Sequence, residues 1–116
     1  MEIRLKRVYD DPAPDDGFRV LVDRLWPRGL SKERAALDLW AKEVAPSTEL
    51  RTAFHHDDMA WPDFETAYRA ELDGPTATAV ASLREELAPH PVVTLLHAVH
   101  DDTHNHALIL REVLAS

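Results

Sequence analysis

Cysteine is absent from this 116-residue sequence, and glycine occurs only three times. The absence of cysteine excludes disulfide bonds, thiolate metal sites, iron–sulfur clusters and a cysteine nucleophile. The scarcity of glycine excludes the glycine-rich loops of P-loop and dinucleotide-binding proteins, and no G-x-S-x-G motif presents a serine nucleophile. These absences remove the common sequence signatures of nucleotide hydrolysis and of covalent catalysis.

Long apolar runs are also missing, and none approaches the roughly 20 residues that a membrane-spanning helix requires. Residues 1–7 alternate apolar and charged side chains, so they lack the apolar core of a secretory signal peptide. We therefore expect a cytoplasmic protein with no membrane partner. With 45% hydrophobic and 29% charged side chains, the chain has the size and composition of one globular domain spanning residues 1–116.

Positive charge is in deficit, with 13 basic against 21 acidic residues and a formal net charge of −8. The imbalance lies in residues 41–116, which hold 5 basic and 13 acidic side chains, whereas residues 1–40 hold 8 of each. An acidic chain repels the phosphates of a nucleic acid, so we expect no nucleic-acid partner. The arginine-rich first third can still attract a small anion, although the net charge could equally serve solubility alone.

The apolar pattern predicts three strands and about five helices. The strands are expected at residues 3–8, 18–23 and 92–96, and the helices at 31–44, 47–54, 61–72, 76–87 and from Thr103 onward. Both buried strands are followed by helices, which favours a small layered α/β domain with a mostly parallel sheet of about three or four strands, flanked by about five helices. Ligands bind such sheets at the carboxyl ends of the strands, so the polar segments 23–29 and 97–106 form the candidate site.

The first polar segment combines an aspartate, two arginines and a tryptophan directly after a predicted strand. Arginine forks bind carboxylate or phosphate groups in a fixed geometry. We therefore expect an anion pocket whose members are Asp23, Arg24, Trp26 and Arg28. The alternative is structural: Asp23 pairs with an arginine to fix the turn, and Trp26 covers the core.

The second polar segment, residues 97–106, carries four of the seven histidines. Histidine titrates near neutral pH, so Asp101 with His104 or His106 is a candidate acid–base pair. Asn105 could donate a hydrogen bond to the ligand. The structural alternative is that an aspartate of this segment assists a helix cap while the histidines stay partly exposed.

Metal binding is another possible use of these histidines. His100 and His104 are four residues apart, as two ligands on one helix face would be. They straddle the predicted helix cap at Thr103, so the spacing does not define a helix face, and we predict no metal site. Residues 54–58, which join two histidines to two aspartates, are either a ligand loop or a solvated connection in which Asp58 caps the next helix.

Several longer motifs are similar to those of a known family. They are the run VLVDRLWPRG from Val20 to Gly29, Trp40, APSTELR from Ala45 to Arg51, Phe54, Asp57, the pattern Trp61-x-x-Phe64-x-x-x-Tyr68-x-x-Glu71-Leu72, and the ending Leu95-Leu96, Asp101 and His104-Asn105-x-Ala107. On these residues the chain resembles the YeaO-like branch of the domain-of-unknown-function family 488 over roughly residues 2–115.

The resemblance implies a small cytoplasmic α/β protein of bacteria or archaea with no established activity. Some members are labelled MarR-type regulators, but an acidic chain without a recognition-helix signature does not support that function here. This sequence departs from the family at His97 and His100, where similar members have an aromatic residue and a lysine. The polar residues shared with the family fall mainly at the two predicted strand ends: Asp23, Arg24, Arg28, Asp101 and Asn105, with His104 alongside.

The expected function is the binding of a small phosphate- or carboxylate-bearing anion at the carboxyl edge of the sheet, with hydrolysis or group transfer left open. No cofactor is indicated. The expected catalytic residues are Asp101, His104 and His106, and the expected ligand-binding residues are Asp23, Arg24, Trp26, Arg28, Asn105, Ser47, Arg51 and Tyr68. The alternative is a non-catalytic protein-interaction or regulatory module, in which Trp26, Trp40 and Trp61 form an exposed apolar patch.

Overall fold

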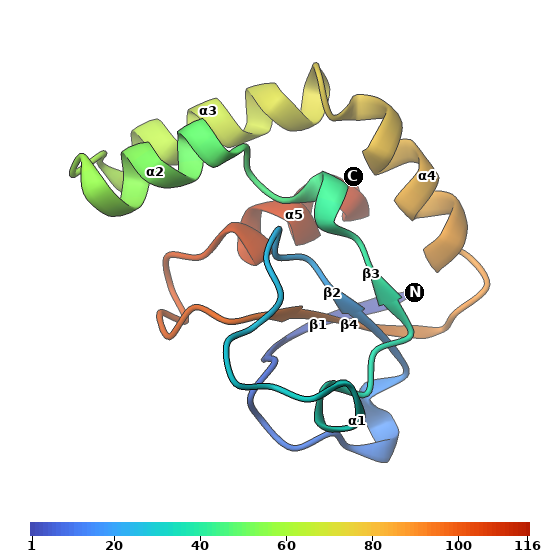
Figure 1. Ribbon diagram of the computed structural model, residues 1–116. Coiled ribbons are helices and arrows are strands. Elements are labelled where there is room, and N and C mark those ends of the chain that lie inside the picture. Colours follow the sequence, from blue (N-terminus) through green and yellow to red (C-terminus); the bar gives the residue numbers. More distant parts are fainter.

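Four parallel strands form one sheet in the computed structural model, which describes residues 1–116 (Figure 1). In the order of the sheet they are β1 (Glu2–Arg7), β4 (Val92–His97), β2 (Phe18–Leu21) and β3 (Leu39–Trp40). β4 pairs with β1 on one side and with β2 on the other. Its apolar run therefore lies inside the sheet and is buried from Val93 to His97, as the sequence predicts. The small α/β fold with a parallel sheet is confirmed.

Four helices cover one face of the sheet (Figure 1). They are α2 (Thr48–His56), α3 (Trp61–Asp73), α4 (Ala77–Leu87) and α5 (His106–Ala115). The buried side chains that join them to the sheet include Val20, Val93, Leu95, Phe64, Tyr68, Leu72 and Leu110. In α3 the predicted apolar stripe is confirmed, because Phe64, Tyr68 and Leu72 are buried and Trp61 is half-buried at its start. Each such burial stabilises the fold by roughly 1.5–3 kcal/mol.

The opposite face is covered by the short helix α1 (Lys32–Ala35) and by loops (Figure 1). Its apolar core is small and consists of Val8, Leu21 and Leu96, against which Trp26 and Trp40 pack. The two indole rings meet edge to face, with 5.5 Å between their centroids. They therefore form part of the packing between the loops and this face.

A buried ion pair holds the rest of this second face together. Arg19 Nη1 lies 2.5 Å from Asp16 Oδ2, and the other guanidinium nitrogens donate to the carbonyls of Ala35 at 2.8 Å and Ala36 at 3.1 Å. Lys6 Nζ lies 3.2 Å from both Asp16 carboxylate oxygens. Burial by itself would raise the pKa of Asp16, but hydrogen bonds from a backbone N–H, Lys6 and Arg19 outweigh it and lower that pKa.

The predicted helix over residues 31–44 is wrong. Ser31 does cap a helix, since its Oγ accepts a first-turn N–H at 3.1 Å, but α1 ends at Ala35. Ala36 then takes a left-handed conformation with φ at 49°, and the chain continues into β3. Because the edge of β2 is free to pair, hydrogen bonds between this segment and β2 override the helical spacing of its apolar residues.

Two expected helix caps also differ. The cap of α5 is Asn105, whose Oδ1 accepts a first-turn N–H at 3.1 Å, and not Thr103, which is bound to the carboxylate of Asp101. Helix α3 begins without a side-chain cap, and Asp58 lies before it in a left-handed turn with φ at 56°. No helix of the structure combines the length and the apolar composition that crossing a membrane requires.

Candidate functional site

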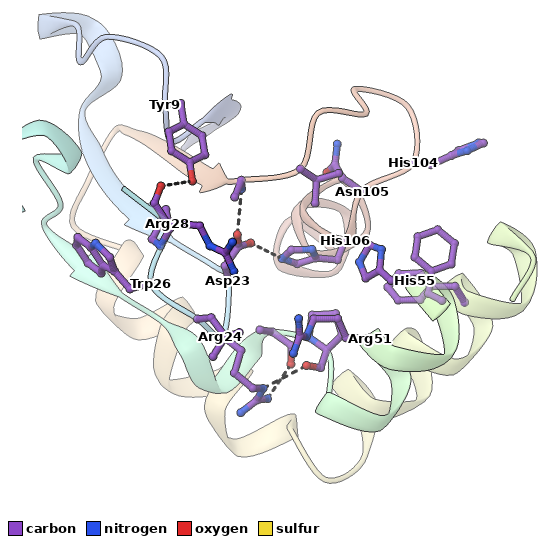
Figure 2. A pocket seen from close by; sticks show the side chains of 18 residues that line it. Tyr9, Asp23, Arg24, Trp26, Arg28, Arg51, His55, His104, Asn105 and His106 are labelled. Carbon is purple, nitrogen blue, oxygen red and sulfur yellow. Dashed lines mark hydrogen bonds and ion pairs between the residues drawn. The ribbon is translucent and has the colours of Figure 1, made fainter. Parts of the chain in front are cut away.

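The polar segments that follow β2 and β4 lie side by side, because these two strands are neighbours in the sheet. Val22 N donates to Leu96 O at 3.0 Å, and one residue farther on Ala98 N donates to the carboxylate of Asp23 at 3.0 Å. The predicted adjacency of the two strand ends is therefore confirmed. Between them and α2 lies a cleft of about 360 Å³, a size typical of small-molecule sites (Figure 2).

Eight of the eleven site residues predicted from the sequence line this cleft. They are Asp23, Arg24, Trp26, Arg28, Arg51, His104, Asn105 and His106. The other three, Asp101, Ser47 and Tyr68, lie outside its lining. Tyr9, which was not predicted, also lines the cleft, as do Phe54 and His55 of the candidate ligand loop at residues 54–58. Tyr9 follows the carboxyl end of β1, so the strand-end rule applied to that strand would have included it.

The three arginines of the cleft differ in how far the protein already uses them. Arg24 donates to the carbonyls of Ala45 at 3.1 Å and Pro46 at 3.3 Å, and so ties the end of β2 to the segment before α2. The guanidinium groups of Arg28 and Arg51 make no hydrogen bond or ion pair with the protein, and Arg51 Nε is buried without a partner. Two arginine forks are therefore free to bind a ligand.

The charge of the cleft is opposite to that of the whole chain. Its lining holds three arginines and one aspartate, a formal charge of +2 with neutral histidines, whereas the chain carries −8. Apolar walls from Trp26, Phe54 and Phe64 reduce the solvent around these charges. A positive, partly desolvated cleft concentrates small anions even in an acidic protein.

His106 is the histidine that the structure fixes most firmly in the cleft. Its Nε2 lies 2.9 Å from Val22 O and 3.2 Å from Asp23 Oδ1, as the dashed line to Asp23 in Figure 2 indicates. The ring also packs edge-on against Tyr68, with 6.1 Å between centroids. The carboxylate beside His106 is thus Asp23, from the end of β2.

Asp101 shapes the loop that leads into α5. Its Oδ1 accepts hydrogen bonds from Thr103 N at 2.9 Å, Thr103 Oγ1 at 2.8 Å and His104 N at 3.1 Å. The bond from Thr103 N–H is the main cause of the lowered pKa of the Asp101 carboxyl. The same loop places His104 in a stack on Trp61 with 4.9 Å between ring centroids. Asn105 Nδ2 donates to Asp101 O at 2.8 Å while its Oδ1 caps the helix.

Ser47 and Tyr68 support the cleft from behind. Ser47 Oγ accepts from Leu50 N at 3.1 Å as the cap of α2, and it donates to Glu71 at 2.5 Å. The Tyr68 hydroxyl donates to Val44 O at 2.6 Å, and burial raises the pKa of this phenol far above its ordinary value. Both side chains position the elements that carry the cleft residues, so their observed contacts are structural.

The remaining histidines do not gather around a metal position. The structure contains no cluster of three or more histidine, aspartate or glutamate side chains arranged to hold an ion. His97 is buried, and burial followed by the nearby His106 lowers its pKa. Burial and then the neighbouring Arg51 similarly lower the pKa of His55. Both therefore favour the neutral ring.

Comparison with known proteins finds relatives over the full length of the chain. The family model that matches residues 2–116 is described as the inactive DUF488-N3 subclade. The uncharacterized protein YeaO of Escherichia coli K12 is 45% identical over 116 residues, which cover 100% of this chain and 99% of YeaO. Uncharacterized proteins of Mycobacterium bovis and Mycobacterium tuberculosis are 42% identical over 112 residues, covering 97% of this chain and 92% of theirs. No solved structure matches the chain.

Proposed function

Since the chain belongs to the inactive DUF488-N3 subclade, we propose that its cleft binds a small phosphate- or carboxylate-bearing anion without transforming it. The observation that carries this proposal is the pair of unpartnered guanidiniums, Arg28 and Arg51, in a cleft of formal charge +2. Other arginines of the chain have a carboxylate partner, as Arg69 has in Glu65 at 3.0 Å. Leaving two of them free in a concave site favours an anionic ligand.

The lining lacks the serine, threonine, cysteine and lysine side chains that most often act as nucleophiles. Its one hydroxyl, that of Tyr9, donates to Arg28 O at 2.9 Å. The Asp23–His106 pair has the form of an acid–base pair, and water is the nucleophile that it would have to activate in any reaction. The family description as inactive agrees with binding rather than reaction.

The alternative of a protein-interaction module has less support. Trp26 and Trp40 pack on each other, and their indole N–H groups donate to Leu30 O at 2.7 Å and Asp23 O at 2.8 Å. Trp61 stacks with Phe64 and with His104 rather than forming a patch with the other two tryptophans. Met1 and Leu25 are the only large apolar side chains that are mostly exposed, and two residues are too few for an extended apolar surface.

A ligand screen by thermal shift and calorimetry tests the proposal. Phosphate and small carboxylates are added to the wild-type protein and to the variants Arg28→Ala and Arg51→Ala. A ligand at about 100 times its Kd adds roughly 2.7 kcal/mol of stability, which corresponds to a Tm increase of several degrees. We expect that increase in the wild type and a reduced one in each variant.

The matched control is Arg84→Ala, which removes a guanidinium on α4 that donates to Val113 O, away from the cleft. This variant should keep the full ligand-induced shift. No shift with any anion, or an equal loss in all three variants, would contradict anion binding in the cleft. Turnover of a phosphate or carboxylate ester that disappears in His106→Phe would contradict the non-catalytic part of the proposal.

A further inference from the structure

The two oxygen atoms near Nε2 determine which ring nitrogen of His106 carries the proton. Both atoms next to Nε2, Val22 O and Asp23 Oδ1, are oxygens that only accept hydrogen bonds. Nε2 must therefore carry a proton, because a bare nitrogen lone pair would face two oxygen lone pairs. In the neutral ring this fixes Nδ1 as the nitrogen without a proton, and so as an acceptor.

Nδ1 of His106 is available to a ligand. It makes no hydrogen bond within the protein, and it is not among the polar atoms that are both buried and unpaired, so it keeps contact with solvent. The ring itself lines the cleft (Figure 2). Asp23 is a poor alternative acceptor for the ligand, because Ala98 N donates to its Oδ2, and its Oδ1 is buried from solvent 3.2 Å from His106 Nε2.

The cleft thus offers two kinds of polar partner to an anion. Arg28 and Arg51 provide N–H donors, which every oxyanion accepts. The fixed acceptor at His106 Nδ1 instead requires a donor on the ligand, and it repels a head group that presents only lone pairs. A site built to hydrogen-bond a hydroxyl discriminates against the analogue that lacks it, because binding covers the acceptor and leaves it without a partner.

We propose that the cleft selects anions that carry a hydroxyl on or beside the charged head, with His106 Nδ1 accepting its hydrogen bond. This inference rests on the proposed anion binding and adds the chemistry that distinguishes one anion from another. Hydrogenphosphate and α-hydroxycarboxylates share that chemistry. Sulfate and simple carboxylates lack it.

The experiment compares two matched pairs of anions by calorimetry at pH 8 and constant ionic strength, above the ordinary titration range of histidine. Hydrogenphosphate and sulfate are tetrahedral dianions that differ in one O–H, and glycolate and acetate are carboxylates that also differ in one hydroxyl. We expect the hydroxylated member to bind roughly tenfold more tightly in the pair that fits the site. A preference only in the first pair identifies phosphate as the ligand class, and a preference only in the second identifies hydroxy acids.

Replacement of the acceptor gives the matched variant. His106→Phe keeps an aromatic ring against Tyr68 and removes Nδ1. The two anions of each pair should then bind with about equal affinity, because Arg28 and Arg51 still bind both. Equal affinities within both pairs for the wild type would overturn selection by His106 and leave anion binding standing. Failure of all four anions to bind would instead overturn anion binding itself, and with it this inference.

A measurement on the wild type avoids any effect of the substitution on folding. Nitrogen-15 NMR of the histidine side chains at pH 8 reports which ring nitrogen carries the proton. We expect His106 to be protonated on Nε2, with the Nδ1 resonance shifting on addition of phosphate but not of sulfate. A ring protonated on Nδ1 would contradict the proposal directly.

Discussion

Asn105 is the single residue on which the start of α5, and so the position of His106, depends. Its Oδ1 caps the helix and its Nδ2 holds Asp101 O, while the side chain is buried. We expect Asn105→Ala to lower the free energy of unfolding by about 1–2 kcal/mol, measured by urea denaturation. Thr103→Ala, at the residue that the sequence suggested as the cap, should cost less than about 0.5 kcal/mol. Equal costs would contradict Asn105 as the cap.

The residues of the cleft could be located from the sequence, but their individual roles could not. The rule that ligands bind at strand ends found both polar segments. It could not distinguish Arg24 from Arg28, because only folding brings the carbonyls of Ala45 and Pro46 to Arg24. Proximity in the sequence favoured Asp101 as a partner for His104 or His106. Asp101 Oδ2 lies 3.8 Å from His104 Nδ1, whereas strand pairing brings Asp23 beside His106.

At the scale of elements, the end of α1 is one of two places where a residue other than glycine has a left-handed backbone conformation. Ala36 has φ at 49°, a left-handed conformation that costs a residue with a Cβ about 1–2 kcal/mol. Ala36→Gly should therefore raise the free energy of unfolding by about 0.5–1 kcal/mol, after the greater entropy of glycine in the unfolded chain is allowed for. The same substitution at Ala81, exposed inside α4, should lower it by about 1 kcal/mol. Thermal unfolding followed by circular dichroism measures both, and a loss of stability in Ala36→Gly would contradict the strain.

The elements that the sequence predicted well are those whose apolar pattern is long and regular. Helix α3 and strand β4 are of this kind. A stripe of apolar residues at helical spacing favours a helix, and a short run of β-branched and apolar residues favours a buried strand. The segment of residues 31–44 has a helical stripe as well, yet most of it is not helical. Its structure is decided by the free edge of β2, which no local pattern reveals, and β3 pairs through only two residues.

On the scale of the whole molecule, the two faces of the sheet are held together by different forces. The helix-covered face has a large apolar core, whereas the other face combines a small apolar core with the buried carboxylate of Asp16. This carboxylate contacts Lys6 of β1 and Arg19 of β2, and the backbone carbonyl of the same residue accepts from Thr94 Oγ1 of β4 at 2.6 Å. Asp16 therefore joins three strands, two of them through its ionised carboxylate, which makes the stability of the molecule sensitive to acid.

The sign of that pH dependence follows from the lowered pKa of Asp16 in the folded state. A carboxyl with a lowered pKa stabilises the fold fully above its unfolded pKa of about 3.9, and this contribution is lost as the pH falls towards the folded pKa. We expect Asp16→Asn to reduce the free energy of unfolding by about 2 kcal/mol at pH 7. The difference from wild type should narrow as the pH falls from 5 to 3.

Urea denaturation at pH 7, 5 and 3 provides the measurement, with Asp15→Asn as the matched control. Asp15 is the neighbouring carboxylate, but its side chain is 77% exposed and its ion pair with Arg4 spans 3.3 Å at the surface. Exposed ion pairs contribute little to stability, so the free energy of unfolding of this variant should match that of the wild type at all three pH values. If Asp16→Asn lost as much stability at pH 3 as at pH 7, the buried carboxylate would owe its effect to packing rather than charge, and the second face would not be held electrostatically.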